Sequence, residues 1–179
     1  MNKRKVFDIL LIVLVVALYR IFPHIPNVAP ITGLALYSGV HLERKYAILL
    51  PLAVMLVSDF FIGFHPGIPY VYGAFVISSL IGIWLKEHLS MSTVIAGTLL
   101  ASLLFFLITN FGVWIGSGMY KKNLEGLRDC FILALPFFRN TIMGDLLYTC
   151  LFFILHAILE LLSKKEAYSY HHENIYKNR

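Results

Sequence analysis

Charged side chains are scarce in this chain of 179 residues. Lysine, arginine, aspartate and glutamate together make up 14% of it, whereas hydrophobic residues make up 59% and the mean hydropathy is +0.76. A soluble domain is closer to half apolar and a quarter charged. The scarcity of charge excludes a sizeable soluble domain and predicts an integral membrane protein.

Cysteine is rare, and the familiar catalytic motifs are missing. The two cysteines, Cys130 and Cys150, lie in apolar sequence without CxxC spacing, which predicts buried thiols rather than a metal or redox site. The sequence has no Walker A loop, HExxH, GxSxG or paired-glutamate metal motif. We therefore expect no enzyme activity, no bound metal and no cofactor.

Apolar runs divide the chain into six predicted spans. A spanning helix needs about 20 apolar residues, and the predicted spans cover residues 6–22, 28–41, 46–64, 69–85, 92–116 and 141–162. The last apolar region is too long for one span, and Pro136 and the polar pair Arg139 and Asn140 divide it. We expect a short interfacial or re-entrant helix at residues 124–138. The predicted fold is an all-α, six-helix transmembrane bundle over residues 1–163, followed by a polar, flexible tail at residues 164–179.

The positions of the basic residues predict the orientation. Six spans place both termini on one side, and lysine and arginine favour the cytoplasmic side. With cytoplasmic termini, residues 2–5, 41–45, 86–88 and the tail all face inward, and they hold most of the basic residues. This distribution accounts for the net charge of +5 and favours the lipid bilayer, rather than nucleic acid, as the partner.

Two carboxylates interrupt the apolar runs, and a carboxylate there is costly unless it pairs with or binds something. In this topology Asp59 and Asp145 both lie near the outer ends of their spans. Other polar and aromatic residues are predicted at the same level: His24, His65, Tyr70, Tyr72, Asn110, Trp114, Arg139 and Asn140. Apolar walls with a few converging polar groups are typical of small-molecule pockets. We predict that these ten residues form an outward-facing ligand site, with Arg139 as the counter-charge of Asp59.

The alternative is a purely structural network. Buried charges in membranes commonly pair with one another, so Asp59 or Asp145 would pair with Arg139 or Arg20 only to hold the helices together. Trp114 and the tyrosines would then belong to the aromatic belt at the membrane surface.

Two spacing patterns predict how the helices pack. Ala35-x-x-x-Gly39 and Gly97-x-x-x-Ala101 are pairs of small residues that permit close helix contact. On the last span, one face is predicted to turn inward because its members recur every three or four residues. That face consists of Thr141, Asp145, Tyr148, Phe152, His156 and Glu160.

Four segments resemble a known group of proteins. They are PHIPNVAPITGLALYSG at residues 23–39, SDFFIGFH at 58–65, TNFGVW at 109–114 and PFFRNTIMGDLLY at 136–148. The chain resembles an uncharacterised family of bacterial six-span membrane proteins. That family is in turn similar to the substrate-binding S-components of energy-coupling factor vitamin transporters, and nearest to the solitary cobalamin type. His24, Asp59, Tyr72 and Arg139 correspond in topology to functional polar residues of that type.

The resemblance implies a membrane transport protein of the bacterial inner membrane that takes up a small, vitamin-like solute through an outward-facing pocket. S-components work with an ATPase and a transmembrane energising module. The Ala-x-x-x-Ala motif by which many of them dock is absent from residues 10–21, and the cobalt-coordinating cysteine of the cobalamin type is absent from residues 64–72. The alternatives are a non-transporting scaffold of cell-envelope assembly and, less favoured, an intramembrane enzyme.

Overall fold

The structure is a computed structural model. It describes the backbone of residues 3–23 and 25–177, and the side chains of residues 11–23, 25–162, 164 and 165. His24, one of the predicted site residues, lies outside the described residues.

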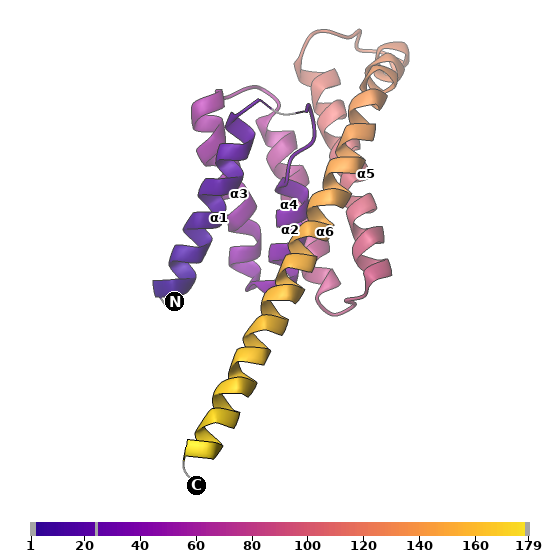
Figure 1. The fold of residues 1–179 in the computed structure, drawn as a ribbon. Coiled ribbons are helices and arrows are strands. Elements are labelled where there is room, and N and C mark those ends of the chain that lie inside the picture. Colours follow the sequence, from indigo (N-terminus) through magenta and orange to yellow (C-terminus); the bar gives the residue numbers. More distant parts are fainter. Residues whose placement is uncertain (1–2, 24, 178–179) are drawn as a thin grey trace.

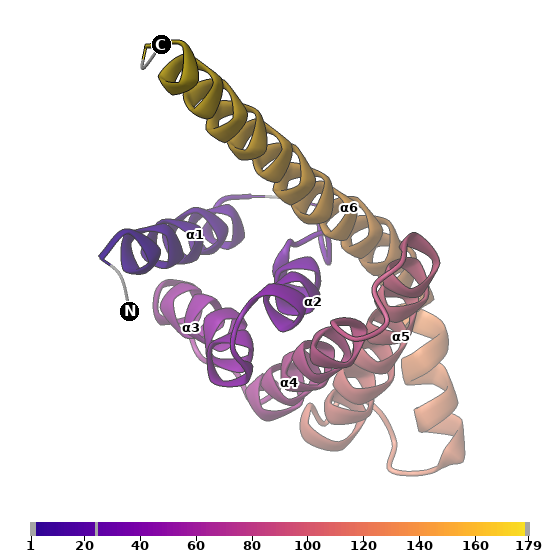
Figure 2. The ribbon, with the colours of Figure 1, turned by 90° about the horizontal axis from the view of Figure 1, so that it is seen from below.

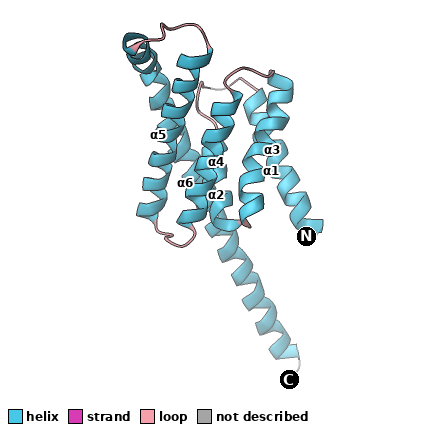
Figure 3. Cartoon of the chain, turned by 180° about the vertical axis from the view of Figure 1, so that it is seen from behind, coloured by secondary structure: helices cyan, strands magenta, loops and turns pink. Residues whose placement is uncertain are grey.

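All regular secondary structure in the described residues is helical, and loops but no strand connect the helices (Figure 3). Its six helices are α1 (Lys3–Ile21), α2 (Ile31–His41), α3 (Arg44–Ile62), α4 (Ile68–Leu85), α5 (Met91–Gly116) and α6 (Leu124–Lys177). The start of α1 and the end of α6 point to the same end of the bundle (Figure 1). The connections at residues 22–23 and 25–30, 63–67 and 117–123 lie at the opposite end, which we call the loop end.

The outer surface has the character of a membrane protein. Four helical segments are long and apolar enough to cross a membrane, namely Arg44–Ile62, Ile68–Leu85, Met91–Gly116 and Leu124–Leu162, and Leu11–Ile21 is a shorter apolar helix. Large apolar side chains point outward, such as Phe60, which is 73% exposed, and Phe61, which is 68% exposed. Apolar exposure on this scale would be a liability in water but suits lipid. The prediction of an all-helical fold is confirmed, and the four long apolar helices support a membrane-embedded protein.

Helix α2 lies at the centre of the bundle (Figure 2). It packs against α3, α4, α5 and α6, and nine of its eleven residues are buried. At 1.5 Å per residue it is only about 17 Å long, too short to cross a bilayer alone. A short helix and the irregular backbone before it are tolerated at membrane depth where protein surrounds them. This helix begins at Ile31 with Pro30 as its N-cap, three residues later than predicted.

Glycines allow the closest contact in the bundle, between α2 and α4. A Cβ atom added to Gly39 would lie 2.5 Å from the carbonyl carbon of Gly82, and one added to Gly82 would lie 2.5 Å from the carbonyl oxygen of Leu36. On α5, a Cβ atom at Gly97 would lie 2.9 Å from Leu85 of α4. The predicted roles of Gly39 and Gly97 in close helix contact are confirmed.

The predicted break before the last span is wrong. Residues 124–138 and 141–162 form one helix, α6, which contains Pro136 and runs past the bundle to Lys177 (Figure 1). A proline in a helix removes one backbone hydrogen bond, but its neighbours in a membrane helix can compensate for that loss. Arg139 and Asn140 also have helical backbone geometry, so this polar pair does not interrupt α6. The backbone of residues 164–177, predicted to be a flexible tail, is also helical.

Candidate functional site

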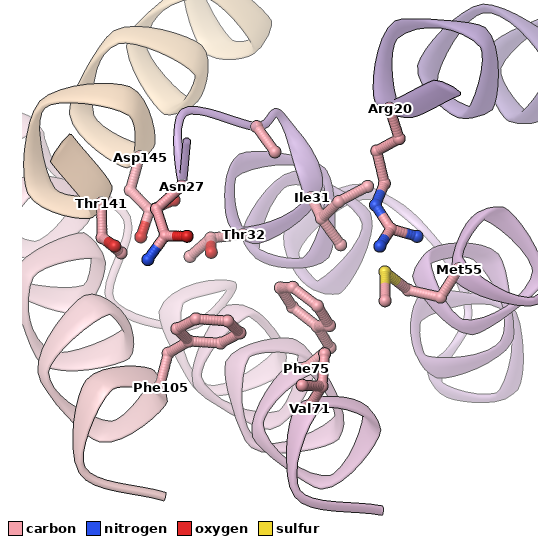
Figure 4. Close-up of a pocket in the computed structure, with 11 residues that line it drawn as sticks. Arg20, Asn27, Ile31, Thr32, Met55, Val71, Phe75, Phe105, Thr141 and Asp145 are labelled. Atoms are coloured by element: carbon pink, nitrogen blue, oxygen red, sulfur yellow. The ribbon is translucent and has the colours of Figure 1, made fainter. Parts of the chain in front are cut away.

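A cavity of about 160 Å³ lies in the loop-end half of the bundle (Figure 4). Its walls come from the end of α1, the starts of α2 and α4, the loop between α1 and α2, and interior turns of α3, α5 and α6. The lining residues are Arg20, Asn27, Ala29, Ile31, Thr32, Met55, Val71, Phe75, Phe105, Thr141 and Asp145. Apolar walls with a few polar groups are the usual composition of a small-molecule site.

Asp145 is the acidic residue of this cavity. It lies on α6 and is only 3% exposed. The hydroxyl of Ser102 on α5 donates to Asp145 Oδ2 at 2.6 Å, and Thr32 of α2 also hydrogen bonds to this carboxyl group. Among the residues whose side chains are described, no lysine, arginine or histidine forms an ion pair with Asp145. A buried carboxyl group without a counter-charge is neutralised by a proton or by a bound cation.

The loop between α1 and α2 covers this part of the bundle and is held to its neighbours. The Tyr19 hydroxyl donates to the Val28 carbonyl oxygen at 3.1 Å, and the Asn140 side-chain amide donates to the Pro26 carbonyl oxygen at 3.2 Å. Gly144 lets the loop approach α6, because a Cβ atom there would lie 3.0 Å from Val28 Cα. Asn140, predicted as a ligand-binding residue, thus positions the loop instead of facing the cavity.

Asp59 is neutralised within the protein. Its Oδ1 atom lies 2.8 Å from Nη1 of Arg20, and its Oδ2 atom accepts a hydrogen bond of 2.9 Å from the Tyr72 hydroxyl. Nη1 of Arg20 also donates to the Ser58 hydroxyl. Asp59 is 1% exposed, whereas the Arg20 side chain is 18% exposed and reaches the cavity wall. We call Arg20, Asp59 and Tyr72 the ion-pair triad.

The predicted pair of Asp59 with Arg139 is wrong. Arg139 is exposed, and no ion pair or hydrogen bond of its side chain is found in the described part of the chain. The helix period explains this position. Arg139 and Asp145 are six residues apart, which places them roughly 120° apart around α6. Since Asp145 faces the cavity, Arg139 must face outward.

Replacing Arg139 with glutamine is therefore expected to change the free energy of unfolding by less than about 0.5 kcal/mol, as for other surface substitutions. Thermal unfolding of the purified protein in detergent would measure this change. A loss of more than about 2 kcal/mol would mean that Arg139 has a buried partner.

The remaining predicted residues do not reach the cavity, and most of them stabilise local structure. The Asn110 amide donates to the Phe106 carbonyl oxygen of its own helix, and the Gly67 N–H donates to His65 Nδ1 in the turn before α4. Trp114 Nε1 donates to the Lys121 carbonyl oxygen in the loop after α5. Tyr70 packs so closely on α5 that a Cβ atom at Gly112 would lie 2.3 Å from its ring.

Besides Asp145, the polar lining of the cavity includes Arg20, Asn27, Thr32 and Thr141, which are not among the ten residues predicted as the ligand site. Thr141 could have been found, because it lies one helical turn before Asp145 on the predicted inward face. Asn27 adopts a positive φ of 62° in the loop, a conformation that asparagine tolerates better than most residues. The sequence places this loop at the outer end of the bundle, but it does not show that Asn27 lines the cavity.

The inward face of α6 continues away from the cavity as predicted. Tyr148 packs edge-on against Tyr19 of α1 with ring centroids 5.6 Å apart. His156 forms a hydrogen bond of 2.9 Å between its Nδ1 and the Tyr37 hydroxyl of α2. This face therefore joins α6 to α2 and to the end of α1, and it turns Asp145 toward the cavity.

The comparisons with known proteins identify a family without assigning an activity. Comparison with curated proteins and with solved structures gives no match. A protein-family model described as "Family of unknown function (DUF6580)" matches residues 1–168. That match covers the six helices almost completely, so this chain belongs to the DUF6580 family.

Proposed function

We propose that this protein binds a small solute in the cavity beside Asp145 and moves it across the membrane. The observation that carries the proposal is the buried carboxyl group of Asp145, which faces the cavity and has no ion-pair partner among the described residues. Ser102 and Thr32 hydrogen bond to this group, but neither carries a positive charge, whereas Asp59 is paired with Arg20. Ionisable residues inside membrane proteins commonly mark ligand or ion pathways.

The size of the cavity limits the solute. A dry cavity of about 150 Å³ in a protein core holds a single benzene ring, whereas pockets for drug-sized ligands measure about 300–1,000 Å³. The cavity of about 160 Å³ therefore favours a solute with one ring or a short chain. A solute as large as cobalamin would need a much wider pocket.

The transport step and its direction rest on the sequence. We propose a multi-pass protein of the bacterial inner membrane with both chain ends in the cytoplasm and the loop end outside, because most of the basic residues then face inward. Uptake, with or without an energising partner module, follows the resemblance to S-components. In this orientation the cavity lies in the outer half of the bundle.

A structural scaffold remains the second candidate, and the ion-pair triad favours it. The close contacts of Arg20, Asp59 and Tyr72 need no ligand to explain them. They do not account for Asp145 or for the cavity, and solute binding accounts for both.

Serine-to-cysteine substitutions at the two ends of α5 test the orientation. Ser117 follows the end of this helix at the loop end, Ser92 lies in its first turn, and both are exposed. In a variant with Cys130 and Cys150 replaced by alanine, we expect a membrane-impermeant maleimide to label Ser117→Cys in intact cells. Ser92→Cys should be labelled only after permeabilisation. The reverse pattern would place the loop end in the cytoplasm and contradict uptake through this cavity.

A further inference from the structure

We infer that the solute is a monocation, an ammonium or amidinium group attached to a small apolar body. This inference rests on the proposed function, since it concerns the ligand of the same cavity. Three properties of the site support it: the sum of its charges, the placement of its oxygen atoms and the nature of its apolar walls.

The charges of the site sum to one negative charge when Asp145 is ionised. Arg20 and Asp145 are the charged residues among those described as lining the cavity, and the positive charge of Arg20 is already matched by Asp59 at 2.8 Å. A bound monocation would bring the sum to zero. A zwitterion would leave the sum at one negative charge. An anion would add a third negative charge to those of Asp59 and Asp145, with only the guanidinium of Arg20 to balance them. Unpaired charge in a poorly hydrated region is costly.

Oxygen atoms gather at one end of the cavity. Figure 4 shows Asp145, Asn27, Thr32 and Thr141 on one side, with Arg20 and Met55 on the other. The carboxylate, the amide oxygen and the two hydroxyls can all accept hydrogen bonds, and an ammonium group has three N–H donors and no acceptor. This end of the cavity therefore suits a compact cationic head group.

Apolar side chains separate the two ends. In Figure 4, Ile31, Val71 and Phe75 lie between the two ends and Phe105 lies on the side of the oxygen atoms, and the rings of Phe75 and Phe105 lie 5.1 Å apart between centroids. Aromatic faces attract cations and pack well on apolar rings. The body of the solute would lie on these two rings, with its head group directed at Asp145.

Three probes that share one ring and differ in charge test this inference. They are benzylammonium, benzyl alcohol and benzoate, and their affinities can be measured from the thermal stabilisation of the full-length protein in detergent. We expect benzylammonium to bind at least tenfold more tightly than benzyl alcohol, and benzoate not to bind. Asp145→Asn should remove the preference for the cation, whereas Asp129→Asn should keep it, because Asp129 lies on the same helix but pairs with Arg128.

Each outcome bears on the inference. Binding of benzoate or benzyl alcohol in preference to benzylammonium would overturn the cationic assignment and leave the proposed binding function standing. A failure to bind any of the three would also overturn the assignment, and the function would then depend on whether another solute co-purifies with the protein. If Asp145→Asn does not fold, the ranking of the probes on the unaltered protein still decides.

Discussion

Replacing Arg20 with methionine is expected to lower the free energy of unfolding by about 3–5 kcal/mol, the usual cost of removing one partner from a buried ion pair. Asp59 is 1% exposed and, among the residues whose side chains are described, would keep only the Tyr72 hydroxyl as a side-chain hydrogen-bond donor. Thermal unfolding in detergent, compared with the unaltered protein, would measure the loss. This substitution acts on the helix contact between α1 and α3, which the pair bridges.

A double substitution provides the control. Arg20→Met combined with Asp59→Asn removes both charges, and the amide oxygen introduced on α3 could still accept the hydrogen bond of Tyr72. We expect the double variant to recover most of the lost stability, since the unpaired charge is gone. If the single variant were as stable as the unaltered protein, the ion-pair triad would not contribute to the fold.

Replacing Gly82 with alanine is expected to cost about 3 kcal/mol of unfolding free energy. The added Cβ atom would lie 2.5 Å from the Leu36 carbonyl oxygen and 2.8 Å from Leu36 Cα, and neither backbone atom can move without displacing α2. Overpacking of a core commonly costs about 1–3 kcal/mol, and a clash with backbone belongs at the upper end of that range. The melting temperature in detergent would report this change.

Gly73 on the same helix is the matched control, because a Cβ atom there meets nothing within 4 Å. Gly73→Ala should be neutral or stabilising by up to about 1 kcal/mol, as alanine favours a helix more than glycine does. Equal effects of the two substitutions would contradict the close packing of α2 on α4.

Much of the fold could be predicted from the sequence. Apolar runs of about 20 residues allow few structures other than membrane helices, so the predicted spans at residues 46–64, 69–85 and 92–116 differ from α3, α4 and α5 by no more than two residues at either end. The failure at Pro136 has a physical reason. Proline is a strong breaker in water, but a helix in a membrane retains its other hydrogen bonds because no solvent competes for them.

The site was harder to predict. The hydropathy pattern indicates how far along its span a residue lies, but it does not indicate which side chains of other helices that residue contacts. Asp59 and Asp145 were both expected near one end of the bundle, and the structure places them there, with Arg20 beside Asp59. Which arginine meets Asp59 depends on α1 packing beside α3, and hydropathy carries no information about that. The α1–α2 loop, which supplies Asn27, is placed by tertiary contacts such as those of Tyr19 and Gly144.

The central claim is that the cavity beside Asp145 holds a small solute, and native mass spectrometry of gently extracted protein tests it most directly. We expect the unaltered protein and Asp129→Asn to carry an added mass corresponding to one small molecule. Asp145→Asn should lose this added mass while remaining folded. A protein that carries no added mass, or an added mass that Asp145→Asn retains in full, would contradict the claim.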